Sequence, residues 1–222
     1  MIIDKRAIRN LRLESGDIFA VKGSGPAAWA CRNLIEPPTD RFHFGIVWMG
    51  TEDGDRVILE SQGEGTMLET VVNIFIHIMV KKGAVGQAIS IGCLSMYEGM
   101  DLRFFRPVYV EKEKRHHVPA ALACYGRDSY GYDFIAKMII GSLWKWAGIM
   151  WRERRFRRLN VIEVPYVTEG KALICTVAPD LGYMLVGEVI LPVGITATPN
   201  AYEQALKDGV LEELFLEGDE KI

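Results

Sequence analysis

The sequence predicts an α+β fold, in which a β-rich first half of the chain precedes a more helical second half. Two observations indicate this. Short segments rich in Val, Ile, Phe and Tyr, bounded by Gly, Asp and Pro, dominate the chain up to about residue 110. Longer segments of helical character follow. With 222 residues, 49% hydrophobic and 25% charged, the chain has the length and composition of one well-buried globular domain.

After a short helix expected at 8–13, the first half carries the expected strands and one further helix. A Gly-rich turn at 23–26 follows the first strand, and Pro37-Pro38 ends the helix. The cluster Gly50-Thr51-Glu52-Asp53-Gly54-Asp55 is turn chemistry that joins two strands into a hairpin. The expected strands are 17–22, 41–49, 56–62, 71–81, 88–93 and 103–110, and the expected helix is 27–35.

The hairpin of 41–49 and 56–62 holds the first candidate pair of functional residues. Side chains alternate faces along a strand, and a turn centred in the linking cluster places Glu60 on the face of His43, opposite or diagonal to it. Gln62 is the neighbouring alternative. A slip of one residue in register would move both to the wrong face. The two residues alone favour a structural interpretation, with His43 ending a strand and Glu60 a solvated charge.

The second half begins with a helix predicted at 118–125, opened by Pro119, because Pro is suited to a first helical turn. A longer apolar helix is predicted at 132–151. It approaches the length that crosses a membrane, but Lys137 and Lys145 favour a buried or membrane-surface helix instead.

A basic cluster follows that helix directly and lies beside three tryptophans. One interpretation is an anchor for anionic lipid headgroups. The other is a solvated helix end whose charges complement the helix dipole. Both interpretations stay open at this point. The arginines of the cluster are Arg152, Arg154, Arg155, Arg157 and Arg158, and the tryptophans are Trp144, Trp146 and Trp151.

The net charge and the spacing of the cysteines argue against several classes of function. A formal net charge of −3 argues against a nucleic-acid binder, for which a basic domain is expected. The four cysteines are widely spaced and form no CxxC pair, so neither a zinc site nor a disulfide framework is predicted. The adjacent His116 and His117 do not share a helix face and are assigned to the surface. No cofactor or metal is expected.

The first residues show no apolar core of signal-peptide length. A cytoplasmic, reduced protein is therefore expected, although a phage or virion protein, or one exported by another route, would present the same features.

Cys175 is the candidate nucleophile. The apolar spacing after it predicts a helix that begins at or just after the Cys, and Pro179 fits the first turn of that helix. The positive end of a helix dipole favours a thiolate. The other three cysteines lie in expected helices or at a strand end and are interpreted as packing residues. A nucleophilic Cys requires a base and an orienting group, and His43 and Glu60 supply both.

The chain resembles the circularly permuted NlpC-type branch of the papain-like cysteine peptidases, which includes YiiX/YaeF-like proteins and relatives of lecithin:retinol acyltransferase. In this branch the His precedes the Cys, as it does here. The segment 196–200 resembles the "TPND" segment of YiiX-like proteins, and its Thr198 and Pro199 predict a helix start. The other resembling segments are Gly16-Asp17-Ile18, Phe42-His43-Phe44-Gly45-Ile46-Val47, Val57-Ile58-Leu59-Glu60 and Ile174-Cys175.

The resemblance implies a papain-like fold with helices packed on a small, barrel-like antiparallel sheet. It implies a single domain over 1–222 with a helical insert around 112–160. It further implies hydrolysis or acyl transfer at an amide or ester of a cell-wall peptide or a lipid, with Cys175 as nucleophile, His43 as base and Glu60 as orienting group. The alternative is an inactive module that binds a lipid or another ligand on the same fold.

Overall fold

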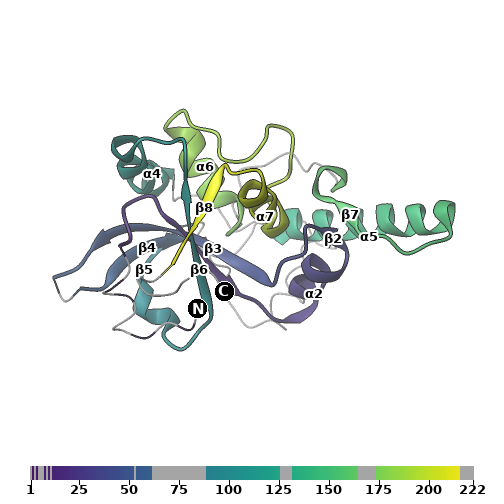
Figure 1. Ribbon diagram of the computed structural model, residues 1–222, viewed down its shortest axis with the longest axis horizontal. Helices are drawn as coiled ribbons and strands as arrows, with labels where there is room; N and C mark the ends of the chain where they lie inside the picture. The colour runs from purple at the N-terminus through teal and green to yellow at the C-terminus, as the bar shows by residue number, and fades with distance from the viewer. Residues whose placement is uncertain are drawn as a thin grey trace.

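A six-stranded antiparallel sheet packed against helices makes up the core of the protein (Figure 1). The computed structural model describes residues 2, 4, 8, 10, 12–52, 54–61, 89–125, 132–164 and 174–215. Its strands are β1 (Ile18–Lys22), β2 (Ile35–Glu36), β3 (Arg41–Gly50), β4 (Arg56–Glu60), β5 (Ser90–Cys93), β6 (Leu102–Pro107), β7 (Leu159–Asn160) and β8 (Leu211–Leu214). Its helices are α2 (Gly25–Asn33), α4 (Lys112–Tyr125), α5 (Tyr132–Glu153), α6 (Val177–Leu185) and α7 (Pro199–Lys207), with 3-10 turns η1 (Leu94–Tyr97) and η2 (Val161–Glu163). The predicted α+β class is confirmed.

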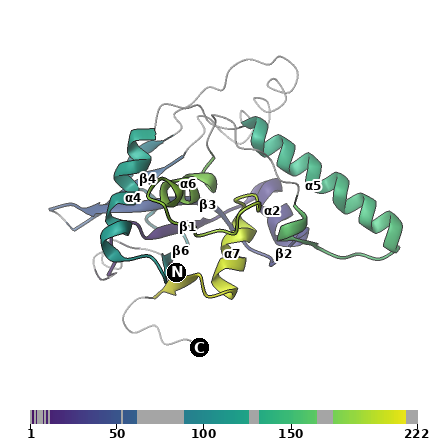
Figure 2. The same ribbon diagram turned by 90° about the horizontal axis from the view of Figure 1, so that it is seen from above.

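The sheet separates two apolar layers. Its strand order is β5-β4-β3-β1-β6-β8, and each neighbouring pair is antiparallel. Along β1, Ile18 and Ala20 face one layer while Phe19 and Val21 face the other, the alternation that a pleated strand imposes. Helices α4 and α6 pack against each other and against β3, and Figure 2 shows them lying over the sheet. Leu94 and Tyr97 of η1 belong to the opposite layer.

Most of the predicted strands are found close to their expected bounds. The strand predicted at 103–110 instead spans Leu102–Pro107, where Pro107 pairs with Leu211 at the end of the ladder. Helix α2 begins two residues earlier than predicted, with Pro26 in its first turn. The strand predicted at 71–81 and the alternative partner Gln62 lie outside the described residues.

The helix predicted at 118–125 begins earlier, at Lys112, so Pro119 lies inside α4 and not in its first turn. An interior Pro cannot donate to the carbonyl four residues before it. In α4 that carbonyl belongs to Arg115, and the backbone of Gly16 lies against it, so closely that a Cβ on Gly16 would sit 2.6 Å from the oxygen. The prediction was wrong because tertiary packing of the buried face of α4 outweighs the local penalty of Pro.

The long apolar helix predicted at 132–151 is confirmed as α5, which extends along one side of the molecule in Figures 1 and 2. One of its faces is buried through Met138, Ser142 and Ile149. Among the helices that the structure describes, none is long and apolar enough to cross a membrane. The segment 112–160, which was expected as a helical insert, thus contains two different helices. Helix α4 packs on the sheet, and α5 extends along one side of the molecule.

Candidate functional site

His43 and Glu60 lie side by side on the hairpin of β3 and β4. Gly45 is the residue directly opposite Glu60 in the ladder, so His43, two residues away on the same face, is the diagonal neighbour of Glu60. The His43 Nε2 atom lies 2.7 Å from Glu60 Oε2. The register predicted from the alternation of side chains is therefore confirmed, and the interpretation of Glu60 as a solvated charge is wrong, because its side chain is only 1% exposed.

Gly45 keeps the space between these strands open. A Cβ at this position would lie 2.4 Å from Cε1 of Phe19 and 2.7 Å from the carbonyl oxygen of Leu59. The Phe19 ring occupies that space and contacts the His43 ring edge-on, with centroids 6.4 Å apart. The missing side chain of Gly45 thus allows an aromatic wall to hold the imidazole in place.

Tyr97 is a site residue that the sequence interpretation missed. Its hydroxyl donates to Oε2 of Glu60, the same oxygen that His43 contacts. Its ring also lies beside those of His43 and Phe19, with centroids 6.0 and 5.6 Å away. Tyr97 belongs to η1, which follows β5, and no local motif marks it. Only the pairing of β5 with β4 brings it to the carboxylate.

Cys175 precedes α6 and does not lie in its first turn. The helix begins at Val177, and the carbonyl of Ile174 accepts hydrogen bonds from the N–H groups of Val177 and Ala178, both 3.0 Å long. Cys175 therefore sits in the turn that opens the helix, at the positive end of its dipole. Pro179 is the third residue of α6, within the first turn as predicted. The helix begins just after the Cys, as predicted, with Thr176 as its N-cap residue.

The Cys175 side chain reaches β3 at a bulge. Val21 pairs with His43 and Lys22 pairs with Arg41, which leaves Phe42 without a partner in β1. Bulges bend a strand and redirect its side chains. The Sγ atom of Cys175 lies 3.6 Å from the carbonyl oxygen of Phe42. The bulge thus brings the backbone beside His43 close to the Cys175 sulfur. Without it the two residues would be separated, because α6 and the His43 ring lie on different sides of the sheet.

The charge state of His43 follows from these neighbours. Burial acts to lower the pKa of His43, but hydrogen bonds to Cys175 and Glu60, and their negative charges, raise it to about 10. The ring is therefore an imidazolium at neutral pH. An adjacent cation favours the thiolate form of a cysteine. Cys175, His43 and Glu60, which the sequence placed far apart, are brought together in one hydrogen-bonded chain.

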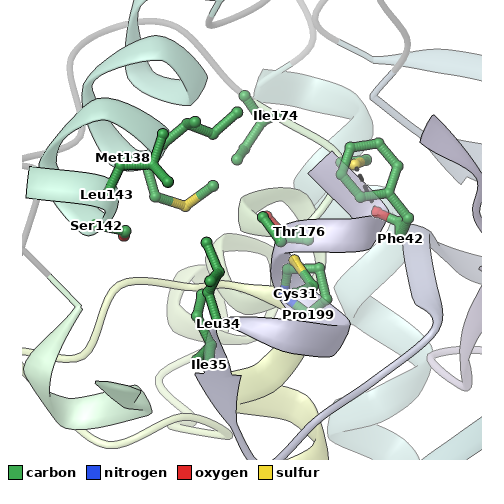
Figure 3. Close-up of a pocket in the computed structure, with 13 residues that line it drawn as sticks. Cys31, Leu34, Ile35, Phe42, Met138, Ser142, Leu143, Ile174, Thr176 and Pro199 are labelled. Carbon is green, nitrogen blue, oxygen red and sulfur yellow. Dashed lines mark hydrogen bonds between the residues drawn. The ribbon is translucent and has the colours of Figure 1, made fainter. Parts of the chain in front are cut away.

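An apolar cavity opens beside Cys175. Figure 3 shows Leu34, which follows α2, and Met138 and Leu143 of α5 converging on it. Phe42 and Ile174 complete the wall near the sulfur. Most of the lining is aliphatic, so the cavity favours a hydrocarbon group over a charged one.

Cys31 lines the same cavity but is not a second nucleophile. Its burial, with a smaller effect from the negative charge of Cys175, raises the pKa of Cys31 to about 12. It is a protonated thiol at neutral pH. Of the other cysteines interpreted as packing residues, Cys93 is half-buried and Cys124 is exposed on α4. The assignment of Cys124 to packing is wrong, because it lies on the solvent side of that helix.

The 196–200 segment supports the turn that holds Cys175. Thr198 caps α7 by accepting from the N–H of Ala201, and Pro199 is the first residue of the helix, as predicted. The buried Asn200 donates to the carbonyls of Cys31 and Pro37, each at 2.7 Å. Tyr202 donates to the carbonyl of Thr176 at 2.6 Å. Through these bonds α7 fixes both α2 and the Cys175 turn.

The remaining candidates form no further centre. His116 and His117 are exposed on α4, as expected. Within the described part of the chain, no three His, Cys, Asp or Glu side chains gather in a way that could hold a metal ion. A comparison of the chain with protein-family models, with curated proteins and with solved structures finds no match.

Proposed function

We propose that the protein is a cysteine hydrolase or acyltransferase of the permuted papain-like type, acting on an ester or amide. The observation that supports this most is the chain of contacts from Cys175 through His43 to Glu60. A sulfur, an imidazolium and a buried carboxylate in this order are the parts of a Cys-His-acid triad.

The chemistry divides into two steps. The Cys175 thiolate attacks the carbonyl carbon of the substrate, and the backbone N–H groups of the turn that opens α6 stabilise the oxyanion. His43 gives its proton to the leaving oxygen or nitrogen, and an acyl thioester remains on Cys175. The neutral His43 then takes a proton from water, or from an acceptor alcohol or amine, which attacks the thioester and releases Cys175. Glu60 engages Nε2, so Nδ1 is the ring nitrogen that exchanges the proton.

The cavity supports a substrate with an apolar acyl group. Its walls near the sulfur are Phe42, Ile174 and residues of α2 and α5. A cell-wall peptide would bring charged and hydroxyl groups for which these walls offer few partners. A fatty acyl ester or amide is therefore the favoured substrate class, and a cell-wall peptide is the alternative.

A second function is an inactive module that binds a lipid in the same cavity. One observation favours it. Cys175 is only 5% exposed, and the open space in the cavity is about 40 Å³, enough for only a few water molecules. A site this narrow would have to widen before a carbonyl could reach the sulfur.

Turnover of a chromogenic acyl ester, p-nitrophenyl octanoate, by three single variants separates the two functions. Cys175→Ser should abolish turnover, because a hydroxyl is a much weaker nucleophile than a thiolate. His43→Ala should be nearly as severe, since both proton transfers use its ring. Glu60→Gln should be milder, because an amide still orients the imidazole.

Cys31→Ser, which changes the other thiol of the cavity, is the matched control and should keep most of the activity. An absence of turnover in the parent protein, with tight binding of octanoate, would favour the binding module. Activity that survives in Cys175→Ser would exclude Cys175 as the nucleophile.

A further inference from the structure

The outer face of α5 is apolar and has no protein against it among the described residues. Ile140, Trp144, Ala147 and Trp151 are spaced to form one stripe along the helix. The side chains of Trp144 and Trp151 are 84% and 89% exposed. Met138, Ser142 and Ile149 lie on the opposite face, which is buried. Helix α5 is thus apolar on two sides, and Figure 2 shows that it lies at the periphery of the molecule.

The end of α5 carries outward-facing positive charge. Arg152, Arg154 and Arg155 are exposed. The other two arginines of the predicted basic cluster are engaged within the protein. Arg157 contacts Glu163 at 2.7 and 2.9 Å, and Arg158 contacts Glu36 at 3.2 Å. Arg155 also contacts Glu153, at 3.3 Å, but its side chain remains 75% exposed. Three of the five arginines that the sequence offers as an anchor are thus exposed.

We propose that α5 docks the protein on an anionic membrane surface. Indole rings that flank a basic helix end fit the boundary between lipid headgroups and acyl chains. The sequence from Lys137 to Arg152 contains three basic residues and no acidic one, although the whole chain is acidic. Anionic headgroups complement this surface. A second copy of the chain would present the same basic stretch from Lys137 to Arg152, which contains no acidic residue to pair with it.

Docking in this way would place the candidate site at the bilayer. Met138, Ile139, Ser142 and Leu143 line the cavity beside Cys175, so one helix carries both the membrane face and a wall of the site. If the protein is the proposed acyl hydrolase or acyltransferase, its substrate would then be a membrane lipid. Only this statement about the substrate rests on the proposed function. The docking surface itself does not require Cys175 to be a nucleophile.

Cosedimentation with vesicles tests the docking surface. The vesicles are phosphatidylcholine with a minority of phosphatidylserine, at low ionic strength. Arg152→Gln/Arg154→Gln should weaken binding by about 25-fold, from roughly fivefold for each arginine near the surface. Lys112→Gln/Lys114→Gln removes two exposed charges from α4 and should change binding by less than about twofold. Added salt should weaken binding of the parent protein.

The apolar stripe is tested separately. Trp144→Ser/Trp151→Ser should weaken vesicle binding by at least about tenfold, whereas Tyr109→Ser, which removes a 77% exposed ring elsewhere, should not. Because these side chains are exposed, circular dichroism should show unchanged folding. Cys175→Ser should bind vesicles like the parent, which keeps this test independent of catalysis.

Three outcomes would overturn the proposal. They are a parent protein that does not sediment with the vesicles, binding that both α5 variants leave unchanged, and self-association that Trp144→Ser/Trp151→Ser abolishes in a protein that does not bind vesicles. The last outcome would make the stripe an interface between copies of this chain.

Discussion

His43 is the residue whose charge state controls the candidate site. It contacts Glu60 through Nε2 and Cys175 through a hydrogen bond, and together these partners raise its pKa to about 10 in spite of burial. The protonated form of the ring is therefore present below about pH 10 and is lost as the pH rises through that value. At neutral pH the site holds an imidazolium beside the sulfur, where an unperturbed His, with a pKa of about 6.5, would be mostly neutral.

This charge state predicts a distinct pH dependence for alkylation by iodoacetamide. Free N-acetylcysteine is the reference thiol, and its alkylation rate should rise about tenfold per pH unit up to a pKa of about 8.5. The rate at Cys175 should change little between about pH 6 and 9, because its cationic partner stays in place. Peptide mass spectrometry measures the rate at Cys175, and the loss of free thiol measures the rate of N-acetylcysteine. The His43 ring resonances in NMR spectra should titrate near pH 10.

Cys175→Ala removes the hydrogen bond and charge of the sulfur, and the His43 titration should then shift to lower pH. A parent protein whose His43 titrates near its unperturbed value, with Cys175 alkylation rising in parallel with that of free N-acetylcysteine, would show that the sulfur and the ring are not coupled.

At the scale of elements, the hairpin of β3 and β4 could be predicted because its information is local. Alternation of side chains and the Gly-Asp turn fix which residues share the face of His43. The features that were missed depend on distant segments. Tyr97 reaches Glu60 only through the β4–β5 pairing, and Pro119 is tolerated inside α4 because the buried face of that helix packs against α6 and β3. No sequence pattern near either residue encodes that contact.

Replacing a glycine by alanine should change the free energy of unfolding in opposite directions in the β3–β4 hairpin and in α5. Gly45→Ala should lower the free energy of unfolding by about 1–3 kcal/mol, because a Cβ would overlap the Phe19 ring and the Leu59 carbonyl. Gly148→Ala is the matched control. It lies on the exposed surface of α5, where a Cβ would have no atom within 4 Å, so the change should raise the free energy of unfolding by about 0.5–1 kcal/mol.

Chemical denaturation of the two variants and the parent protein measures both effects. Equal stability of Gly45→Ala and the parent would mean that Phe19 does not pack against this strand as described.

At the scale of the whole molecule, the α+β class follows from the sequence, because the order of strand-like and helix-like segments is visible along the chain. The assembly of the site is not visible in this way. Cys175 and His43 are 132 residues apart in the sequence, and a bulge at Phe42 is needed to bring their elements together. The ion pairs within the basic cluster are not visible for a similar reason, since the glutamates that bind Arg157 and Arg158 could not be assigned from composition.

The covalent acyl thioester on Cys175 is the central claim of this account, and intact-protein mass spectrometry tests it most directly. The parent protein and Cys175→Ser are each mixed with p-nitrophenyl octanoate and quenched in acid within the first turnovers. The parent should gain the mass of one octanoyl group, located on the Cys175 peptide after digestion, and Cys175→Ser should gain none. An adduct that appears equally in both proteins, or no adduct in a parent that turns the ester over, would contradict a nucleophilic role for Cys175.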